Sequence, residues 1–508
     1  MFSFLICLAL LIGGYFVYGG IVEKTFGPDD RETPAVKIND GVDYMVLPQW
    51  KLFMIQLLNI AGLGPIFGAL SGALWGPVVF LWITFGTIFA GAVHDYFSGM
   101  MSERNEGASI SEISGIYLGG AMKNVMRVFS VVLLVMVGTV FAVGPAGLIQ
   151  LLCTKGGSTG IFASKLFWLV LILIYYFIAT FLSIDKIIGK IYPLFGICLI
   201  IMAIGVAVGI FTKPEYTIPE IWNNFGSMHP SGTPVWSFMF ITVACGAISG
   251  FHSLVSSGTT SKQLDKETDA KPIAYGGMLL ECVLAVLTLC AIGYAYKWNA
   301  VHPDQALKGA TAIFGGGIAH MIDDIIPGSY SILNSLLVLT YSAFCLTSLD
   351  TATRLARFMF QEFWLEPGET AADIKEGWKK VMVNPYFATI LTVVLGILLG
   401  MNGYGKIWGL FGAANQLLAG IGLLAVATWL GNMGKNNKMF LIPMAFMIIV
   451  TITSLALTVK NQIGMIAAGG ADWGPWAQTI LGILLIFLAI ILVIEGVQTL
   501  SKQKAARA

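Results

Sequence analysis

The sequence predicts an all-α integral membrane protein with about thirteen transmembrane helices, and three observations support this prediction. Hydrophobic residues make up 56% of the chain and charged residues only 11%, whereas a soluble domain carries about 25% charged residues. Apolar segments of about twenty residues, long enough to cross a hydrocarbon core of about 30 Å as helices, recur along the chain. Two of these segments are interrupted by glycine and proline at comparable depths. Most of the surface is therefore expected to face lipid.

The predicted helices follow the apolar segments in order, because only helices and closed barrels cross a bilayer without leaving backbone groups unpaired. The first segment, residues 2–22, has no basic residues before it and no A-x-A cleavage site, so we expect a helix and not a signal peptide. The other helices are expected at residues 50–70, 74–98, 125–152, 164–184, 188–212, 235–257, 272–296, 329–350, 384–402, 407–431, 439–459 and 475–498.

Lys and Arg residues determine the expected orientation, because they are enriched in cytoplasmic loops. With the N-terminus outside, most of the 29 Lys and Arg residues fall on the cytoplasmic side, including those of the C-terminal tail. An even number of helices would destroy this alternation. We therefore expect a multi-pass protein of the inner (plasma) membrane, with its N-terminus outside and its C-terminus in the cytoplasm.

Two predicted helices, at residues 50–70 and 235–257, contain helix-breaking residues in their apolar middle. These residues are Gly62, Gly64 and Pro65 in the first helix and Gly246, Ser249, Gly250 and His252 in the second. Glycine costs a helix about 1 kcal/mol and proline removes a backbone donor, so both helices are expected to break beside a protein-lined cavity that binds substrate. The alternative is that the glycines only permit close helix packing.

The two expected breaks lie five helices apart, which indicates a five-plus-five inverted repeat, since transporters of this kind carry broken helices at corresponding positions. One helix would precede this core and two would follow it. The expected parts are an N-terminal helix (1–22), a cytoplasmic loop (23–49), the first repeat (50–212), an extracytoplasmic loop (213–234), the second repeat (235–431), and two accessory helices with a cytoplasmic tail (432–508).

Ionisable side chains inside the predicted spans cost about 2.5 to 3.5 kcal/mol near the bilayer centre, so each is a candidate for function. His252 lies in the second expected break, where it contacts a ligand or proton or else bonds a freed carbonyl. Glu281 lies deep in its helix, where a carboxyl that gains and loses a proton would couple transport to protons. His94 and Asp95 close their predicted helix, as an interfacial pair or, for Asp95, as a second coupling group.

The segment TSLDTATR, at the predicted end of the helix at 329–350, offers oxygen ligands suited to a hard cation such as Na⁺. The candidate ligands are Thr347, Ser348, Asp350 and Thr351. The alternative is that Asp350 and Arg354 form an i,i+4 ion pair at a helix end. The coupling ion is therefore expected to be H⁺ or Na⁺.

Two amides, Asn415 and Gln416, lie inside the predicted helix at 407–431. Amides in a membrane span bond to neighbouring helices or to a solute. We therefore include both among the candidate substrate-binding residues.

The sequence also excludes several classes of function. HExxH and GxxxxGK[ST] motifs are absent, and the seven cysteines form no CxxC pair. A net charge of +1 provides no basic field to attract nucleic acid. We expect no enzyme activity, no cofactor and no metal centre. The expected partners are the lipid bilayer and a small-molecule substrate, and the sequence carries no signature of an oligomeric state.

Six sequence blocks between residues 27 and 419 form a specific pattern in a fixed order. They read GPDDRETPAVKINDGVDY, IAGLGPIFGAL, FAGAVHDYFSGMMSERNEGAS, GAISGFHSLVSSGTTSKQ, TSLDTATR and WGLFGAANQLLA. Together they resemble the carbon starvation (CstA) proteins, a family of peptide transporters that includes pyruvate carriers. The resemblance implies a fold like that of the amino acid-polyamine-organocation (LeuT-like) transporters. It also implies uptake of pyruvate or short peptides, driven by protons, in the carbon-starvation response.

Two features depart from the family pattern. Where that pattern carries adjacent histidines just before the IAGxGP block, this chain has Ile55 and Gln56. A coupling role of those histidines therefore does not transfer to this chain. The C-terminus is also shorter than in the longer members.

These observations lead to the hypothesis of a secondary active transporter that holds a carboxylate-bearing nutrient, pyruvate or a short peptide, between the two breaks. The partly positive N-termini of the half-helices would hold the carboxylate. The alternatives are a sodium-coupled carrier, a channel, and a membrane nutrient receptor or sensor without net transport.

Overall fold

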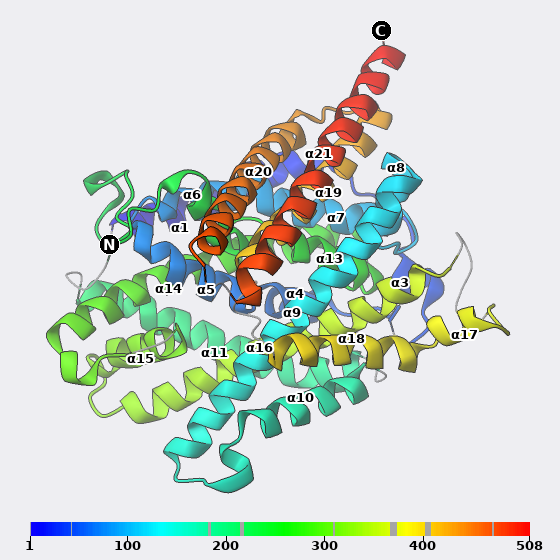
Figure 1. Ribbon diagram of the computed structural model, residues 1–508. Coiled ribbons are helices and arrows are strands. Elements are labelled where there is room, and N and C mark those ends of the chain that lie inside the picture. The colour runs from blue at the N-terminus through cyan, green and yellow to red at the C-terminus, as the bar shows by residue number, and fades with distance from the viewer. Residues whose placement is uncertain are drawn as a thin grey trace.

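The protein is described by a computed structural model that covers residues 2–41, 43–180, 184–213, 218–307, 310–365, 373–401, 408–469 and 472–507. Within this part of the chain the regular elements are helices, with no strand among them (Figure 1). This confirms the all-helical class. The predicted helix ends near residues 181–183, 402 and 407 lie outside the described residues.

The α-helices are α1 (Phe2–Phe16), α2 (Tyr18–Phe26), α3 (Pro34–Ile38), α4 (Gln49–Ile60), α5 (Leu63–Gly72), α6 (Val79–Gly86), α7 (Ala92–Glu103), α8 (Ile110–Leu118), α9 (Gly120–Lys155), α10 (Lys165–Ala179), α11 (Ile184–Thr212), α12 (Phe240–Thr242), α13 (Gly250–Gly258), α14 (Gly276–Val301), α15 (Ala310–Asp323), α16 (Tyr330–Glu362), α17 (Trp378–Met382), α18 (Pro385–Met401), α19 (Trp408–Asn432), α20 (Lys438–Ala467) and α21 (Trp473–Arg507). Short 3-10 or π-helical segments are η1 (Ala73–Trp75), η2 (Thr87–Gly91), η3 (Gly160–Ala163), η5 (Ile221–Asn223), η6 (Val235–Met239), η7 (Ala244–Gly246), η8 (Thr260–Lys262), η9 (Glu267–Asp269), η10 (Lys271–Tyr275) and η11 (Pro303–Gln305).

Each predicted membrane segment overlaps one or more described helical elements, and those at 74–98 and 235–257 are divided among four elements each. Among the described residues, 8 helices are long and apolar enough to cross a membrane, or up to 9 when the bent pair α4 and α5 is taken as one span. Other segments, such as α10 and α18, are apolar but shorter. The protein therefore has several membrane-spanning helices, and the count of thirteen stays a prediction.

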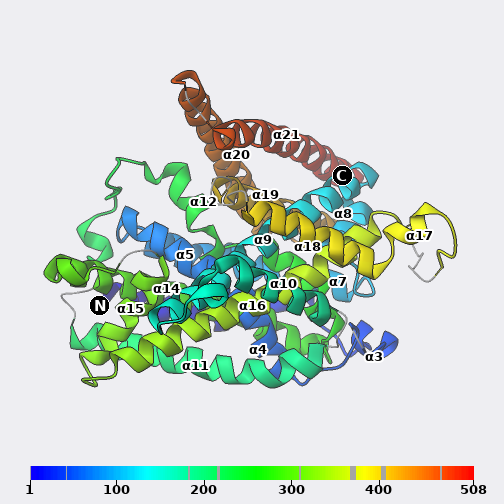
Figure 2. The same cartoon turned by 60° about the horizontal axis from the view of Figure 1, so that its bottom comes forward.

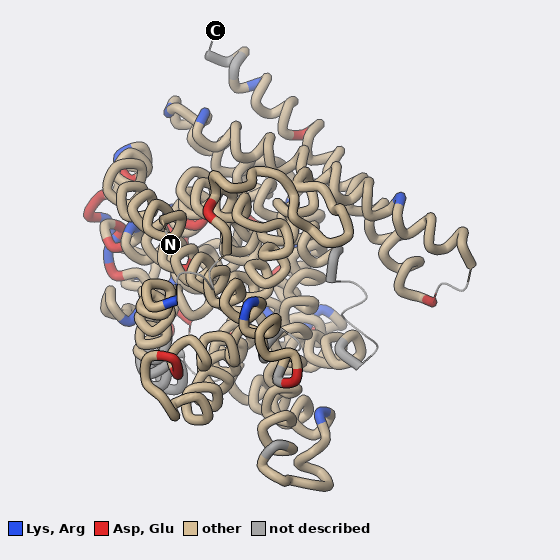
Figure 3. The backbone as a smooth tube through the Cα atoms, turned by 90° about the vertical axis from the view of Figure 1, so that its left-hand side faces the viewer, with Lys and Arg blue, Asp and Glu red and all other residues tan. Residues whose placement is uncertain are grey.

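The helices differ in how far the bundle encloses them. α14 and α19 are largely buried within the protein, whereas fewer than half of the residues in the apolar windows of α20 and α21 are buried, and these two helices project as a pair away from the other helices (Figure 2). Charged residues lie mainly near helix ends and in loops (Figure 3). Charged groups in the middle of the bundle are therefore exceptions that need partners.

The helix predicted at 74–98 begins and ends later than expected. Gly76, at a φ of 79°, makes a turn after η1 that an L side chain would strain, and the new span runs from Val79 to Glu103. His94 and Asp95 consequently lie inside the helix, and each is 0% exposed. They do not close the helix, as the sequence predicted, but are enclosed by protein. The polar end of α7 stays helical because α13 packs against it.

The helix predicted at 329–350 is also longer than expected, since α16 continues to Glu362. TSLDTATR therefore lies within a helix and not at its end. A polar segment of this kind remains helical because neighbouring protein buries it: Ser348, Asp350 and Arg354 are each 2% exposed or less. Hydropathy alone ends the helix too early, because it treats every polar residue as facing lipid or water.

The predicted cytoplasmic loop contains the short helix α3 and packs against a distant part of the chain. The backbone N–H groups of Met45 and Leu47 donate to the carbonyls of Lys262 and Gln263 at 3.1 and 3.2 Å. Arg104 pairs with Glu267 in the same region. Hydrogen bonds and an ion pair therefore hold the predicted loop and the end of α7 against the segment that follows α13.

Candidate functional site

The first predicted break is present between α4 and α5. α4 ends at Ile60, α5 begins at Leu63, and the two helices are bent by 44°. Pro65 lies in the first turn of α5, where its missing N–H would have had no partner within the helix. The sequence therefore starts a new helix at this point instead of continuing the old one.

The second predicted break is present as well. η7 ends at Gly246, α13 begins at Gly250, and the intervening residue Ser249 is extended, with φ −141° and ψ 130°. Gly250 cannot be replaced without displacement of a neighbour, because a Cβ atom there would lie 2.3 Å from the carbonyl oxygen of Asn415. The positions of both breaks are thus confirmed.

Side chains from α19 and η2 bond the backbone groups that the second break frees. Thr87 Oγ1 donates to the carbonyl of Gly246 at 2.9 Å, and Gln416 Nε2 donates to that of Ile248 at 3.0 Å. Asn415 Oδ1 accepts from the N–H of Phe251 at 2.8 Å, and its Nδ2 donates to Ser249 Oγ at 2.9 Å. Both amides therefore bond across helices, one of the two roles that the sequence left open.

Hydroxyl groups from α16 hold the first break. Ser348 Oγ donates to the carbonyl of Asn59 at 3.0 Å, and Thr351 Oγ1 donates to Asn59 Oδ1 at 2.7 Å. A Cβ atom at Gly62 would lie 2.7 Å from Ser348 Oγ. Glycine is therefore needed where the break approaches α16.

The other residues predicted in TSLDTATR bond differently. Thr347 Oγ1 donates to the carbonyl of Ala343 in its own helix at 2.9 Å. Arg354 Nε donates to Asp350 Oδ2 at 3.3 Å, and Arg354 Nη2 donates to the carbonyl of Ala179. The i,i+4 pair is thus present, while Ser348 and Thr351 face the break.

A cavity of about 160 Å³ lies between the two breaks. Its lining includes Gly64 from the first break and Cys245, Ser249 and His252 from the second. Its walls also contain the amide of Asn415 and the aromatic rings of Phe141 and Phe251. Five other predicted substrate-binding residues belong to the breaks or bond to them but do not line the cavity: Gly62, Pro65, Gly246, Gly250 and Gln416. The breaks also touch, because a Cβ atom at Gly64 would lie 2.5 Å from Cys245 Cβ.

Four buried ionisable side chains lie in a row beside this cavity, in the order Glu281, His252, Asp95 and His94. His252 Nε2 is 3.6 Å from Glu281 Oε2, and His252 Nδ1 is 3.1 Å from Asp95 Oδ2. Asp95 Oδ1 is 3.0 Å from His94 Nδ1. Each of the four is 2% exposed or less. We call this group the buried ionisable cluster.

The sequence identified the members of this cluster separately but not their contact. His252, Asp95 and Glu281 stood out because an ionisable group in a membrane span is costly. His94 was noticed only as a neighbour of Asp95. The structure brings α7, α13 and α14 together, so that His252 becomes the member that lines the cavity.

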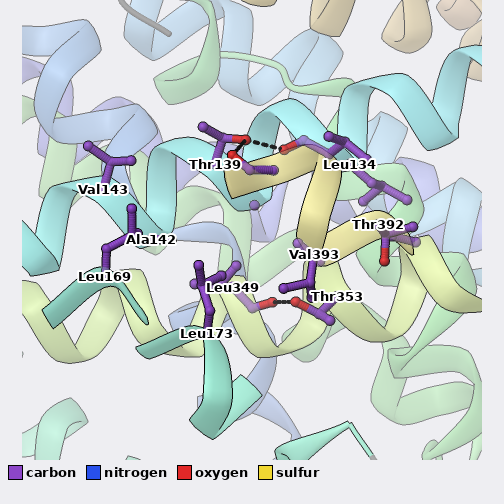
Figure 4. A pocket seen from close by; sticks show the side chains of 15 residues that line it. Leu134, Thr139, Ala142, Val143, Leu169, Leu173, Leu349, Thr353, Thr392 and Val393 are labelled. Atoms are coloured by element: carbon purple, nitrogen blue, oxygen red, sulfur yellow. Dashed lines mark hydrogen bonds between the residues drawn. The ribbon is translucent and has the colours of Figure 1, made fainter. Parts of the chain in front are cut away.

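A second hollow, of about 30 Å³, lies between α9, α10, α16 and α18 (Figure 4). Its walls are mostly apolar, with Leu134, Leu173 and Leu349 among them. Thr139 Oγ1 donates to the carbonyls of Val135 and Gly396, and Thr353 Oγ1 donates to that of Leu349. Its hydroxyl donors are therefore already used, and this hollow is unsuited to a carboxylate.

The fold is similar to that of solved membrane transporters. The structure resembles a crystal structure of a manganese transporter from Eremococcus coleocola, with a TM-score of 0.57 at 12% identity over 92% of this chain and 99% of the other. It also resembles MhsT in complex with L-phenylalanine, with a TM-score of 0.56 at 15% identity over 90% and 99% of the two chains. At these identities the likeness shows the fold alone.

The chain belongs to the carbon starvation protein CstA family, whose model matches residues 1–151, 150–306 and 294–454. The peptide transporter CstA of Bacillus subtilis is 28% identical over 97% of this chain and 95% of its own. The pyruvate/proton symporter BtsT of Escherichia coli is 27% identical over 84% of this chain and 77% of its own. An uncharacterized membrane protein of Haemophilus influenzae is 38% identical over 61% and 94%. The expected family is confirmed, and the chain belongs with transport proteins and not with enzymes.

Proposed function

We propose that this protein is a proton-coupled secondary transporter that imports a small carboxylate-bearing nutrient, with pyruvate as the favoured substrate. The observation that carries the proposal is the position of His252. This side chain lines the cavity between the breaks and also contacts Asp95 and lies near Glu281. His252 would therefore take part both in substrate binding and in proton binding.

Charge supports a coupling role for the cluster. A buried ionised group without a partner is expensive in a membrane protein, so the net charge of the cluster is expected to stay near zero. A substrate carboxylate that enters the cavity adds one negative charge beside His252. Uptake of one proton by the cluster restores the balance. Binding of the anion and binding of the proton consequently favour each other.

The N-terminus of α5 is the proposed binding group for the carboxylate. A helix N-terminus carries partial positive charge and backbone N–H groups without partners in the helix. Gly64, in the first turn of α5, lines the cavity, and its missing side chain lets Cys245 of the second break approach closely. The matching residues of α13 are less accessible, because Asn415 bonds the N–H of Phe251.

Pyruvate is favoured because a pyruvate/proton symporter is among the relatives and because a cluster of buried ionisable groups lies beside the cavity. A thermal-shift comparison tests the choice, since the preferred ligand stabilises the folded state by mass action. We expect stabilisation by pyruvate and not by dialanine, and the reverse order would assign the cavity to peptides.

A sodium-coupled carrier is the second candidate. Asn59, Ser348 and Thr351 gather oxygen atoms at the first break, as a hard cation requires. In both cases we place the protein in the inner membrane, with the N-terminus outside and with repeats at 50–212 and 235–431.

Uptake into proteoliposomes tests the proposal. We expect labelled pyruvate to accumulate when an inward proton gradient is imposed, and a protonophore to abolish the accumulation. Stimulation by a sodium gradient alone would favour the second candidate. Binding without flux would indicate a receptor, and flux without accumulation would indicate a channel.

Two substitutions separate binding from coupling in the same assay. His252→Ala is expected to weaken pyruvate binding, because it removes the imidazole side chain that lines the cavity. Glu281→Gln is expected to abolish the proton dependence of uptake while exchange of bound pyruvate continues. Unchanged kinetics in both variants would remove these residues from the mechanism.

A further inference from the structure

The acceptor oxygens at the two breaks are already engaged by protein groups. The carbonyls of Gly246, Ile248 and Asn59 accept hydrogen bonds from side chains at 2.9, 3.0 and 3.0 Å. A ligand with an ammonium group needs such acceptors, because an ammonium group can only donate. The backbone of the breaks is therefore poorly suited to bind an amino acid or a peptide through its amino group.

The side chains of the cavity wall do not replace these acceptors. Among the described residues that line the cavity, none is an aspartate or a glutamate. Asp95 and Glu281 lie beside His252, which itself lines the cavity, but neither carboxyl group belongs to the lining. A positively charged amino group in the cavity would thus lack a carboxylate partner, which is costly for a buried charge.

Asn415 arranges a hydroxyl group of the second break as a donor. The N–H of Phe251 can only donate, so the amide oxygen of Asn415 faces it, at 2.8 Å. The amide nitrogen then donates to Ser249 Oγ at 2.9 Å. Because Ser249 Oγ accepts this bond, its own hydrogen stays available for another oxygen. A neighbouring sulfur, that of Cys245, is only a weak acceptor. Ser249, which lines the cavity, can therefore donate to a ligand.

A further part of the cavity wall is apolar. Its residues are Val137, Val140, Phe141, Ile241 and Phe411. Such a wall suits an aliphatic tail and offers no partner to a second charged group. The ligand that fits the cavity therefore has acceptor oxygens and a short aliphatic tail. A 2-oxo acid meets both requirements, because its carboxylate and oxo oxygens accept hydrogen bonds and do not donate them.

We propose that Ser249 is a specificity-determining residue: it donates a hydrogen bond to the 2-oxo oxygen of the substrate and so selects short 2-oxo acids over amino acids and peptides. This inference rests on the proposed function, in which the N-terminus of α5 holds the carboxylate. It deepens that function by naming the group that recognises the neighbouring oxygen of the substrate.

The first test uses the full-length wild-type protein, so that no variant has to fold. Pyruvate, propionate and L-alanine share one carbon skeleton and differ at carbon 2, which carries an oxo group, two hydrogens or an ammonium group. We expect pyruvate to bind at least about tenfold more tightly than either analogue in isothermal titration, because a site built to hydrogen-bond a group rejects ligands without it. Binding of propionate or L-alanine as tight as that of pyruvate would overturn the inference.

Ser249→Ala tests whether the preference depends on this hydroxyl. The affinity for pyruvate should fall at least about fivefold, whereas the affinity for propionate should change by less than about twofold, because propionate has no oxo oxygen to lose a bond. Ser257→Ala is the matched control on the same helix. Its hydroxyl bonds the carbonyl of Ser253 at 2.6 Å and does not line the cavity, so both affinities should stay unchanged. An equal loss for both ligands in Ser249→Ala would assign Ser249 a structural part and overturn the inference.

A second variant reverses the polarity around Ser249. Asn415→Asp keeps an oxygen for the N–H of Phe251 but replaces the amide donor by an acceptor, so the hydrogen of Ser249 turns toward the new carboxylate. The ratio of the two affinities should then fall to nearly its value in Ser249→Ala. A ratio that stays at the wild-type value in both variants would overturn the inference and leave the proposed function intact. A wild-type protein that binds neither pyruvate nor propionate would instead overturn the proposed function, and this inference with it.

Discussion

The two broken helices meet the same physical requirement with different partners. At the first break, hydroxyl groups of Ser348 and Thr351 bond the oxygen atoms of Asn59. At the second break, Asn415 bonds both a freed N–H group and a side-chain hydroxyl. At the first break, side chains therefore bond the end of the preceding helix but not the N-terminus of the following one. At the second break, side chains also bond the N-terminus of the following helix.

This difference indicates a division of labour between the breaks. α5 has no side-chain cap at its N-terminus, and Gly64 in its first turn lines the cavity. The N-terminus of α13 is occupied by Asn415. We infer that the first break offers backbone donors to an anionic substrate, while the second break holds His252 in place.

The largest effect is expected from Gly64→Ala, which tests the binding role of the first break. The new Cβ atom would meet Cys245 Cβ at 2.5 Å and would narrow the cavity at the N-terminus of α5. We expect the affinity for pyruvate to fall at least tenfold, or about 1.4 kcal/mol. Addition of Cys245→Gly should restore part of the loss, as measured by uptake kinetics in a double-mutant cycle. Wild-type affinity in Gly64→Ala would place the carboxylate elsewhere.

A smaller effect is expected from Asn415→Ala, which tests the supporting role of the second break. The variant leaves the N–H of Phe251 and the hydroxyl of Ser249 without their partner. Loss of a buried partner costs about 1–3 kcal/mol, so the melting temperature and the uptake rate should both fall. Gln462→Ala removes an amide on α20 and serves as the control. An Asn415→Ala protein as stable as the control would contradict this account of the break.

The smallest effect is expected from Ser348→Ala at the first break. Its hydroxyl makes a bond to Asn59 whose removal costs about 0.5–1.5 kcal/mol. Ser342→Ala, which loses a hydroxyl bonded within its own helix, is the matched control. Uptake should be measured with and without sodium. If sodium stimulates uptake by the wild-type protein and by the control but not by Ser348→Ala, the first break is an ion site and not the site of the carboxylate.

Some features of the site follow directly from local sequence. Gly62 and Pro65 predict the first break because they disfavour a continuous helix wherever they occur. Gly250 predicts the second break on the same ground, and the structure adds that only glycine fits so close to the backbone of α19. Helix ends were predicted less well. Asp95 and Asp350 are enclosed by protein, and hydropathy does not distinguish such a position from an interface.

The sequence alone determined that the chain is a multi-pass helical membrane protein and where two of its helices break, because apolar length and glycine or proline placement act over a few turns. Only the tertiary structure decided that Asp95 meets His252, 157 residues away, and that Asn415 fills one break while the other opens on a cavity. Such contacts depend on which helix faces pack together, and the energy of that packing is shared among many residues that are distant along the chain.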